Sequence, residues 1–215
     1  GFSGFPRADL VIEAVFEELS VKRAVVADLE ATVGDKAIIA TNTSTIPITD
    51  IAAGAHHPDR VLGMHFFSPV DRMPLLEVIP GAATSPDAIA TAVQFGRRMG
   101  KTVIVVADRP GFWVNRILSP YLNEAGHLLT EGTPIEAIDR TMTRFGFPVG
   151  PIALLDEVGL DVAAKGGGVM HQAFGERLAP ADVIGRMLAD KRLGRKSGRG
   201  FYRYQDGKKA GVDAE

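Results

Sequence analysis

The stretch 61-VLGMHFFSPVDRMPLLEVI-79 holds two apolar runs joined by a loop with two prolines, and each run carries one ionisable side chain near its centre. Short apolar runs bounded by turn residues are typical of buried strands. If the two strands are antiparallel neighbours paired symmetrically about Asp71, His65 faces Glu77. Directly opposed residues have Cβ atoms about 4.5–5.5 Å apart. The stretch therefore predicts one hairpin of a sheet, with an imidazole beside a carboxylate.

The residues before and after this hairpin alternate between strand and helix patterns. Strands are expected at 9-DLVIEAV-15, 37-AIIATN-42 and 102-TVIVVA-107, and helices at 20-SVKRAVVADLEATV-33 and 86-PDAIATAVQFGRRMG-100. Strands that are apolar on both faces and separated by helices indicate a mostly parallel sheet covered by helices. The first part of the chain is therefore predicted to be a doubly wound α/β domain.

After 108-DRPG-111 the pattern becomes helical. Helices are expected at 112–131, 134–146, 151–165 and 180–190, and the next strand-like run is 200-GFYRY-204. Pro120 lies inside the first of these helices, where its missing N–H predicts a kink or a local break. The predicted fold class is thus α/β plus all-α, with one domain at residues 1–109 and a small helical domain at residues 110–215.

One element of a dinucleotide-binding domain is not found. Such a domain opens with a strand, a G-x-G-x-x-G turn and a helix, which together hold the pyrophosphate. The glycine clusters 166-GGG-168 and 198-GRG-200 lie in the helical half, and the chain begins with glycine rather than methionine. We therefore expect the chain to be a piece of a longer protein whose first strands and glycine-rich turn are missing, which would expose an apolar strand edge.

The composition is that of a soluble globular protein, with 46% hydrophobic and 23% charged residues. A net charge of −2 gives no electrostatic reason to expect nucleic acid, and no apolar run is long enough for a membrane span or typical of a secretory signal. The lack of cysteine excludes disulfides, and a cytoplasmic location is expected. The basic segment 191-KRLGRKSGR-199 is interpreted as a solvated turn, with a docking site for an anionic group as the alternative.

His65 and Glu77 have the chemistry of a general base and its partner. A neighbouring carboxylate fixes which ring nitrogen of the histidine carries the proton and leaves the other nitrogen able to accept one. Spacing alone leaves open that they are two separately satisfied polar residues. The other histidines have no carboxylate at a comparable spacing, and no grouping of His, Asp and Glu predicts a metal site.

Further polar residues follow the predicted strands. Ligands of open parallel sheets lie beyond the carboxyl ends of the strands, and at these ends lie Glu17 and 41-TNTS-44. The TNTS segment could instead cap the helical stretch 47–53. Asn115 is expected to be buried one turn into the long helix, where it has either a ligand or a packing or capping role. The His65 segment lies at the end of the third strand, so polar groups from three strands are predicted to meet at one edge of the sheet.

Taken together, seven segments resemble the 3-hydroxyacyl-CoA dehydrogenase family from about residue 2 to 205. Their sequences are most similar to the dehydrogenase part of the bacterial multifunctional fatty acid oxidation complex α-subunit. The segments are 11-VIEAVFEELSVK-22, 41-TNTSTIPI-48, 63-GMHFFSPV-70, 74-PLLEVIPG-81, 110-PGFWVNRIL-118, 146-GFPVGPIALLDEVGLD-161 and 194-GRKSGRGFY-202.

The resemblance implies a Rossmann-type domain, NAD as cofactor, and oxidation of L-3-hydroxyacyl-CoA to 3-ketoacyl-CoA in fatty acid β-oxidation. It implies that His65 is the catalytic base, that Glu77 is its carboxylate partner, and that Ser44 and Asn115 bind the substrate oxygen or organise the nicotinamide and thioester region. Ser68 departs from the asparagine that many relatives have. The implied cofactor contacts are Val15, Phe16, Glu17, Lys22, Asn42, Ser44 and Ser68.

The resemblance also implies partners, namely an acyl-CoA substrate and a thiolase subunit, and leaves a homo-oligomer open. The alternative hypothesis rests on the missing phosphate-binding turn. In this hypothesis the chain is a non-catalytic fragment whose helical half is a packing or oligomerisation module of a larger multifunctional enzyme. The parent protein is then the dehydrogenase, and the chain by itself is expected to be inactive.

Overall fold

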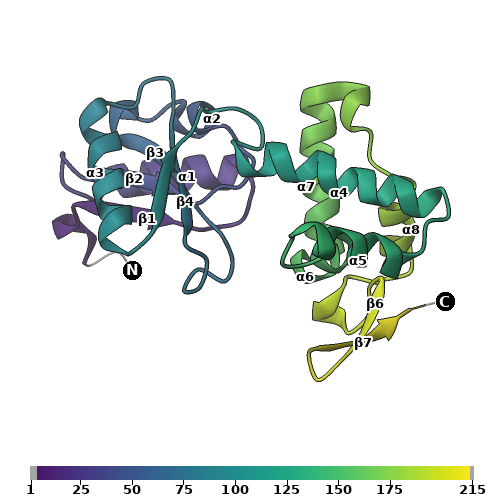
Figure 1. Ribbon diagram of the computed structural model, residues 1–215. Coiled ribbons are helices and arrows are strands. Elements are labelled where there is room, and N and C mark those ends of the chain that lie inside the picture. Colours follow the sequence, from purple (N-terminus) through teal and green to yellow (C-terminus); the bar gives the residue numbers. More distant parts are fainter. Residues whose placement is uncertain (1–3, 214–215) are drawn as a thin grey trace. The chain divides into compact units, whose positions relative to one another are not determined.

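The computed structural model describes residues 4–213 (Figure 1). The chain folds as two compact units, Gly1–Asn115 and Arg116–Glu215. Helix α4 (Val114–Thr130) contributes residues to both units. The predicted domain boundary between residues 109 and 110 therefore stays a prediction.

The first unit is built on a five-stranded sheet with the strand order β1-β2-β3-β4-β5 (Figure 1). The pairs β1–β2, β2–β3 and β4–β5 are parallel, whereas β3 and β4 are antiparallel. The mostly parallel sheet with one antiparallel hairpin is therefore confirmed. The strands are β1 (Leu10–Glu13), β2 (Ile38–Thr41), β3 (Val61–Phe66), β4 (Leu75–Pro80) and β5 (Thr102–Val105).

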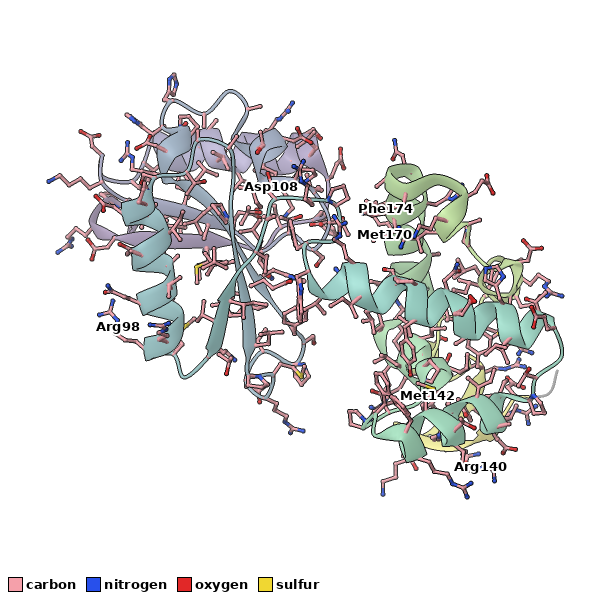
Figure 2. The ribbon with its side chains drawn as sticks, turned by 45° about the horizontal axis from the view of Figure 1, so that its top comes forward. Arg98, Asp108, Arg140, Met142, Met170 and Phe174 are labelled. Atoms are coloured by element: carbon pink, nitrogen blue, oxygen red, sulfur yellow. The ribbon has the colours of Figure 1, made fainter. Side chains whose placement is uncertain are left out.

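Helices cover both faces of this sheet. Successive side chains of a strand point to opposite faces, so neighbouring residues of β2 contact the helices on each side. Ile39 packs with helices α1 (Leu19–Glu30) and α2 (Ile48–Ala52), while its neighbours Ile38 and Ala40 pack with helix α3 (Pro86–Arg98). Helix α3 begins where the sequence predicts, since Pro86 occupies its first turn and the Ser85 hydroxyl accepts a hydrogen bond from the Ala88 amide. It ends near Arg98, which is labelled in Figure 2. Two apolar layers thus enclose the sheet.

Two contacts place α2 tightly on the sheet. A Cβ at Gly63 of β3 would lie 2.7 Å from the Ile48 side chain of α2, so glycine permits this approach. The carboxylate of Asp108, labelled in Figure 2, accepts hydrogen bonds from the backbone amides of Ile48 (2.7 Å) and Thr49 (2.8 Å). These amides lie at the N-terminus of α2, where the helix itself offers them no acceptor. The segment after β2 is therefore fixed to the segment after β5.

The second unit is mostly helical, as predicted, with an added β-hairpin. Helix α4 continues through Pro120, so the local break is wrong, while the kink stays a prediction. One missing hydrogen bond leaves the rest of a 17-residue helix and its packing in place. The predicted helix 151–165 is split at Gly159, whose φ of 97° is left-handed.

The elements after α4 are α5 (Ile135–Phe145), α6 (Pro151–Val158), α7 (Leu160–Phe174), α8 (Asp182–Ala189), β6 (Tyr202–Gln205) and β7 (Lys208–Val212). Short 3-10 helices lie at Phe5–Arg7, Pro58–Arg60, Gly175–Leu178 and Arg195–Ser197.

Two buried carboxylates attach the hairpin to the helices. Asp156 of α6 accepts the backbone amides of Phe201 and Tyr202, each at 2.9 Å. The Tyr202 hydroxyl donates to Asp139 of α5 at 2.7 Å. Burial raises the pKa of Asp156 even though its hydrogen bonds act in the opposite direction, and burial together with Asp139 raises the pKa of Tyr202. Polar contacts thus join the hairpin to the apolar core of the second unit.

The basic segment 191–199 is tied to the end of the hairpin. Asp213 accepts hydrogen bonds from Nε of Arg199 (2.8 Å) and of Arg203 (3.0 Å), and Arg192 lies 3.9 Å from it. The Arg192 side chain is 7% exposed. The interpretation of the segment as a solvated turn is therefore wrong for Arg192, because ion pairing at short range allows a charged group to be buried.

Ring contacts complete the second unit. The guanidinium of Arg116 lies 4.9 Å from the ring centre of Phe174 at the end of α7, which Figure 2 labels. The Tyr121 ring of α4 stacks on Phe147 at 4.8 Å. These contacts join α4 to later parts of the same unit. Among residues 4–213, no helix combines the length and the apolar character needed to cross a bilayer.

Candidate active site

The antiparallel hairpin brings His65 and Glu77 together as the sequence predicts. The two residues are register partners of β3 and β4, and Gly63 faces Ile79. Nδ1 of His65 lies 2.7 Å from Oε2 of Glu77, with the two residues 4% and 0% exposed. A neutral histidine donates its Nδ1 proton to this carboxylate, which leaves Nε2 as the nitrogen that accepts a proton. The geometry therefore supports a paired rather than a separate role.

Two aromatic rings flank the imidazole of His65. Its centre lies 4.5 Å from that of Phe67 and 5.8 Å from that of Phe112. Phe112 is 3% exposed and belongs to the apolar core shared with α1 and α2. The hydrogen bond between His65 and Glu77 therefore lies in an apolar setting, where such bonds are stronger than in water.

Glu77 has a second set of partners that the sequence did not suggest. Its other oxygen, Oε1, accepts hydrogen bonds from the backbone amides of Trp113 (3.0 Å) and Val114 (2.9 Å). These amides lie at the start of α4, where the helix leaves its first N–H groups unpaired and carries a partial positive charge. A fully buried carboxylate thus has three donors, which offset the cost of its burial.

Glu17 organises the TNTS segment at the neighbouring strand end. Its Oε1 accepts hydrogen bonds from the Thr43 hydroxyl (2.7 Å), the Ser44 amide (2.9 Å), and the amide and hydroxyl of Thr45 (3.0 and 3.1 Å). Burial opposes ionisation of Glu17, but the bonds from Thr43 and Ser44 and the nearby Lys22 outweigh it, so its pKa lies below the ordinary value. Glu17 therefore fixes the backbone that presents Ser44.

Asn115 reaches the same segment. Its Nδ2 donates to the backbone oxygen of Ser44 at 3.0 Å. The residue is the second of α4 and is half-buried, so the expectation of a buried asparagine one turn into the helix is wrong. The helix begins later than predicted because Phe112 adopts a left-handed conformation with φ of 48°. The Asn115 side chain nevertheless contacts the backbone of Ser44.

Lys22 is buried, although the resemblance implies that it contacts the cofactor. Its side chain is 0% exposed, and Nζ lies 3.1 Å from Glu13 and 3.5 Å from Glu17. Glu13, 5% exposed, also accepts the Val15 amide at 3.0 Å. Glu13 was not singled out from the sequence, although a carboxylate in an otherwise apolar strand was a visible signal. In this structure Lys22 stabilises the carboxylates under the strand ends.

The remaining predicted cofactor contacts lie around this edge. Val15 and Phe16 are exposed by 38% and 87% just beyond β1. Asn42 accepts the Phe66 amide through Oδ1 at 2.9 Å, which links the ends of β2 and β3. Ser68 is exposed in the loop after β3. Of these residues, Asn42 uses its side-chain oxygen in a hydrogen bond within the sheet, while Phe16 presents apolar surface to solvent.

The other histidines have partners of their own within their units. The amides of His56 and His57 donate to Glu30 at 2.9 and 2.8 Å, at the opposite end of α1 from Lys22. His127 contacts Asn123 and the Ala179 carbonyl. Across residues 4–213, no three His, Asp or Glu side chains are grouped so that they could hold a metal ion.

Two family models match the chain. One described as 3-hydroxyacyl-CoA dehydrogenase, NAD binding domain, covers residues 2–109, and one described as 3-hydroxyacyl-CoA dehydrogenase, C-terminal domain, covers residues 111–204. The fatty acid oxidation complex subunit alpha of Vibrio cholerae is 54% identical over 213 residues, which are 99% of this chain and 30% of that protein. The chain therefore spans less than a third of this relative.

Solved structures agree in fold. M. tuberculosis FadB2 is 40% identical with a TM-score of 0.90, over 93% of this chain and 72% of that chain. The (S)-3-hydroxybutyryl-CoA dehydrogenase PaaH1 from Ralstonia eutropha is 40% identical with a TM-score of 0.91, over 96% of this chain and 74% of that chain.

Proposed function

Since the chain belongs to the 3-hydroxyacyl-CoA dehydrogenase family, we propose that its protein oxidises L-3-hydroxyacyl-CoA to 3-ketoacyl-CoA with NAD in fatty acid β-oxidation. The observation that carries the proposal is the buried pair of His65 and Glu77, with Nδ1 and Oε2 2.7 Å apart. NAD, when bound, supplies the acceptor of the hydride from C3 of the substrate.

The residues of the pair have distinct roles in the proposal. His65 takes the proton of the 3-hydroxyl group at Nε2, because Nδ1 is engaged by Glu77. Glu77 stabilises the imidazolium that results, since a nearby negative charge favours the protonated form. Glu77 remains an acceptor throughout, with Oε1 held by the amides of Trp113 and Val114. The proton thus stays on the imidazole until it is released to solvent.

Ser44 and Asn115 orient the substrate oxygen in this proposal. Both side chains come from segments that are held independently of the substrate, because Glu17 fixes the backbone of Ser44 and the Asn115 amide contacts the Ser44 carbonyl. Groups whose positions are fixed before binding lose little entropy when the substrate arrives. In this proposal the hydrogen bonds of Glu17 therefore fix the segment that carries Ser44 before the substrate binds.

The side chains at the strand ends are suited to the nicotinamide side of the cofactor. The Phe16 side chain, 87% exposed at the carboxyl end of β1, offers apolar surface where ligands of such sheets bind. Val15 is also exposed, and Glu17 retains 24% exposure of its side chain. Lys22 is buried and would act through Glu17 rather than by touching the ribose. Residues 4–213 contain no glycine-rich turn from a strand to a helix, so the proposal covers the nicotinamide side alone.

The test is His65→Ala in the full-length protein that contains this chain. Removal of a general base is expected to lower kcat with a 3-hydroxyacyl-CoA substrate about 10²–10⁴-fold. His56→Ala is the matched control, because His56 is exposed and its contact with Glu30 is made by the backbone amide. A rate within a few-fold of wild type for His65→Ala would overturn the proposed base.

The proposal extends to partners. The V. cholerae relative is named as a subunit of a complex, which supports an assembly that passes the acyl-CoA product to another enzyme, and we propose a thiolase as that enzyme. Co-purification of thiolase activity with the tagged full-length protein tests this. Homo-oligomerisation and a cytoplasmic location stay predictions.

A second candidate function is a packing module. It is favoured by exposed apolar side chains in the second unit, where Phe145 is 79% and Val162 54% exposed. Isolated exposed apolar residues are normal, so this support is weaker than that of the buried pair. Calorimetric titration of NAD into the 215-residue chain separates the two candidates, because micromolar binding would rule out a purely packing role.

A further inference from the structure

Phe112 has an unusual backbone for a buried aromatic residue. Among the described residues, the non-glycine residues with a positive φ are Phe112 (48°), Lys191 (58°) and Asp206 (49°). Lys191 and Asp206 are exposed, whereas Phe112 is 3% exposed. A left-handed conformation is unfavourable for a residue with a Cβ and is kept only where the surroundings enforce it.

The conformation has a definite effect on the next two residues. The Phe112 amide donates to the Arg109 carbonyl at 2.8 Å, which closes a turn directly before α4. The turn directs the amides of Trp113 and Val114 at Oε1 of Glu77, at 3.0 and 2.9 Å. An extended or right-handed residue at position 112 would give the chain another direction at this point.

The Phe112 ring acts on the other member of the pair. Its centre lies 5.8 Å from that of the His65 imidazole, which Phe67 also flanks at 4.5 Å. The two rings restrict the rotation of the imidazole and keep water from the bond between Nδ1 and Glu77. One residue thus contacts both partners, His65 through its ring and Glu77 through the amides that follow it.

We propose that Phe112 is a positioning residue for the His65–Glu77 pair, with its left-handed backbone holding Glu77 and its ring holding the imidazole. Its effect on catalysis rests on the proposed function, whereas its effect on the geometry of the pair does not. The proposed role does not require the Phe112 ring to contact substrate or cofactor.

The two parts of this role are separated by Phe112→Gly and Phe112→Ala in the full-length protein. Both variants lack the ring, but alanine disfavours the left-handed conformation and glycine does not. We expect kcat of Phe112→Gly to fall on the order of tenfold, because an unrestrained base loses part of its contribution. The kcat of Phe112→Ala should be lower still, on the order of fivefold below that of Phe112→Gly. KM should stay within about threefold in Phe112→Gly, since glycine keeps the direction of the chain that leads to Asn115.

The control uses the same exchange at another left-handed residue. Lys191→Gly and Lys191→Ala, at φ of 58° on the surface of the second unit, should shift the unfolding midpoint in the same order but leave kcat unchanged. If the Lys191 pair changes kcat in parallel with the Phe112 pair, general stability explains the effect and the proposal is overturned. It is also overturned if Phe112→Ala is as active as Phe112→Gly.

A readout independent of activity completes the test. In ¹⁵N-histidine-labelled protein, the signal of the proton on Nδ1 of His65 is identified by its loss in His65→Ala. This signal should be weakened by exchange with water in Phe112→Gly, which lacks the ring, and weakened further in Phe112→Ala, which also lacks the left-handed backbone that holds Glu77. Equal signals in the two folded variants would overturn the proposal. If the wild-type protein shows no dehydrogenase activity, the proposed function fails, and this signal still decides the role of Phe112.

Discussion

Glu77→Gln tests the hydrogen bonding of the buried pair most directly, because the substitution keeps the shape and removes one acceptor. The amide can be oriented in two ways. If its oxygen replaces Oε1, it still accepts the amides of Trp113 and Val114, and its NH₂ group then faces Nδ1 of His65. If the NH₂ group replaces Oε1, it faces two backbone donors, which leaves buried donors unpaired.

The first orientation costs less and has a consequence for the tautomer of His65. Facing an NH₂ donor, Nδ1 must accept, so the proton of a neutral imidazole moves to Nε2. The proposed base is then blocked, and losses of up to about 10⁴-fold in kcat follow such a change in enzymes built this way. We expect kcat to fall between about 10² and 10⁴-fold. The exchange of charged for neutral hydrogen bonds from two amides should also cost about 1–3 kcal/mol of stability.

The assay combines steady-state kinetics of the full-length protein with urea unfolding. Glu30→Gln is a close control, because Glu30 also accepts two consecutive backbone amides, those of His56 and His57, but has no imidazole partner. It should lose less stability, since the loop is exposed, and keep its activity. A kcat for Glu77→Gln within about fivefold of wild type would refute the tautomer argument.

Three further predictions concern other polar contacts. Glu17→Gln should lower stability by about 1–2 kcal/mol in urea unfolding, because the hydrogen bonds of the TNTS segment lose their charged acceptor. Gly200→Ala should lower it by about 1–3 kcal/mol in the same assay, since its Cβ would collide with the Asp156 carboxylate. The hydrogen bonds from Arg199 and Arg203 lower the pKa of Asp213 to about 2 from 3.8. The stability that Asp213 provides, about 1–2 kcal/mol after solvent screening, should therefore be complete above pH 3.8 and be lost as the pH falls towards 2. Unfolding of wild type and Asp213→Asn between pH 5 and 2 would measure this loss.

Each of these has a matched comparison. Glu18→Gln removes a neighbouring surface carboxylate that accepts a hydrogen bond from the Ser20 hydroxyl, so an equal loss there would contradict the role of Glu17. Gly185→Ala places a Cβ on α8 with no atom within 4 Å and should be neutral or stabilising. A difference between wild type and Asp213→Asn that grows as the pH falls would have the wrong sign for a lowered pKa.

Local patterns were sufficient for the sheet and for the central pair. Strand alternation and symmetry about Asp71 were enough to place His65 opposite Glu77, because side-chain direction in a hairpin follows from register alone. The strand-end rule placed Glu17 beside TNTS for a similar reason. Strand β7 was not predicted, since 208-KKAGV-212 is polar and almost wholly exposed and so lacks a burial pattern.

The sequence by itself determined the five strands of the sheet, most of the helices and the polar residues at the sheet edge, because apolar periodicity and strand direction are properties of short segments. Tertiary structure alone decided the left-handed turn at Phe112, the amides of α4 that hold Glu77, and the burial of Lys22 against Glu13. Each of these depends on residues distant in sequence or on a strained conformation that only the packed surroundings maintain. A local pattern carries no information about such contacts, since they exist only once the chain has folded.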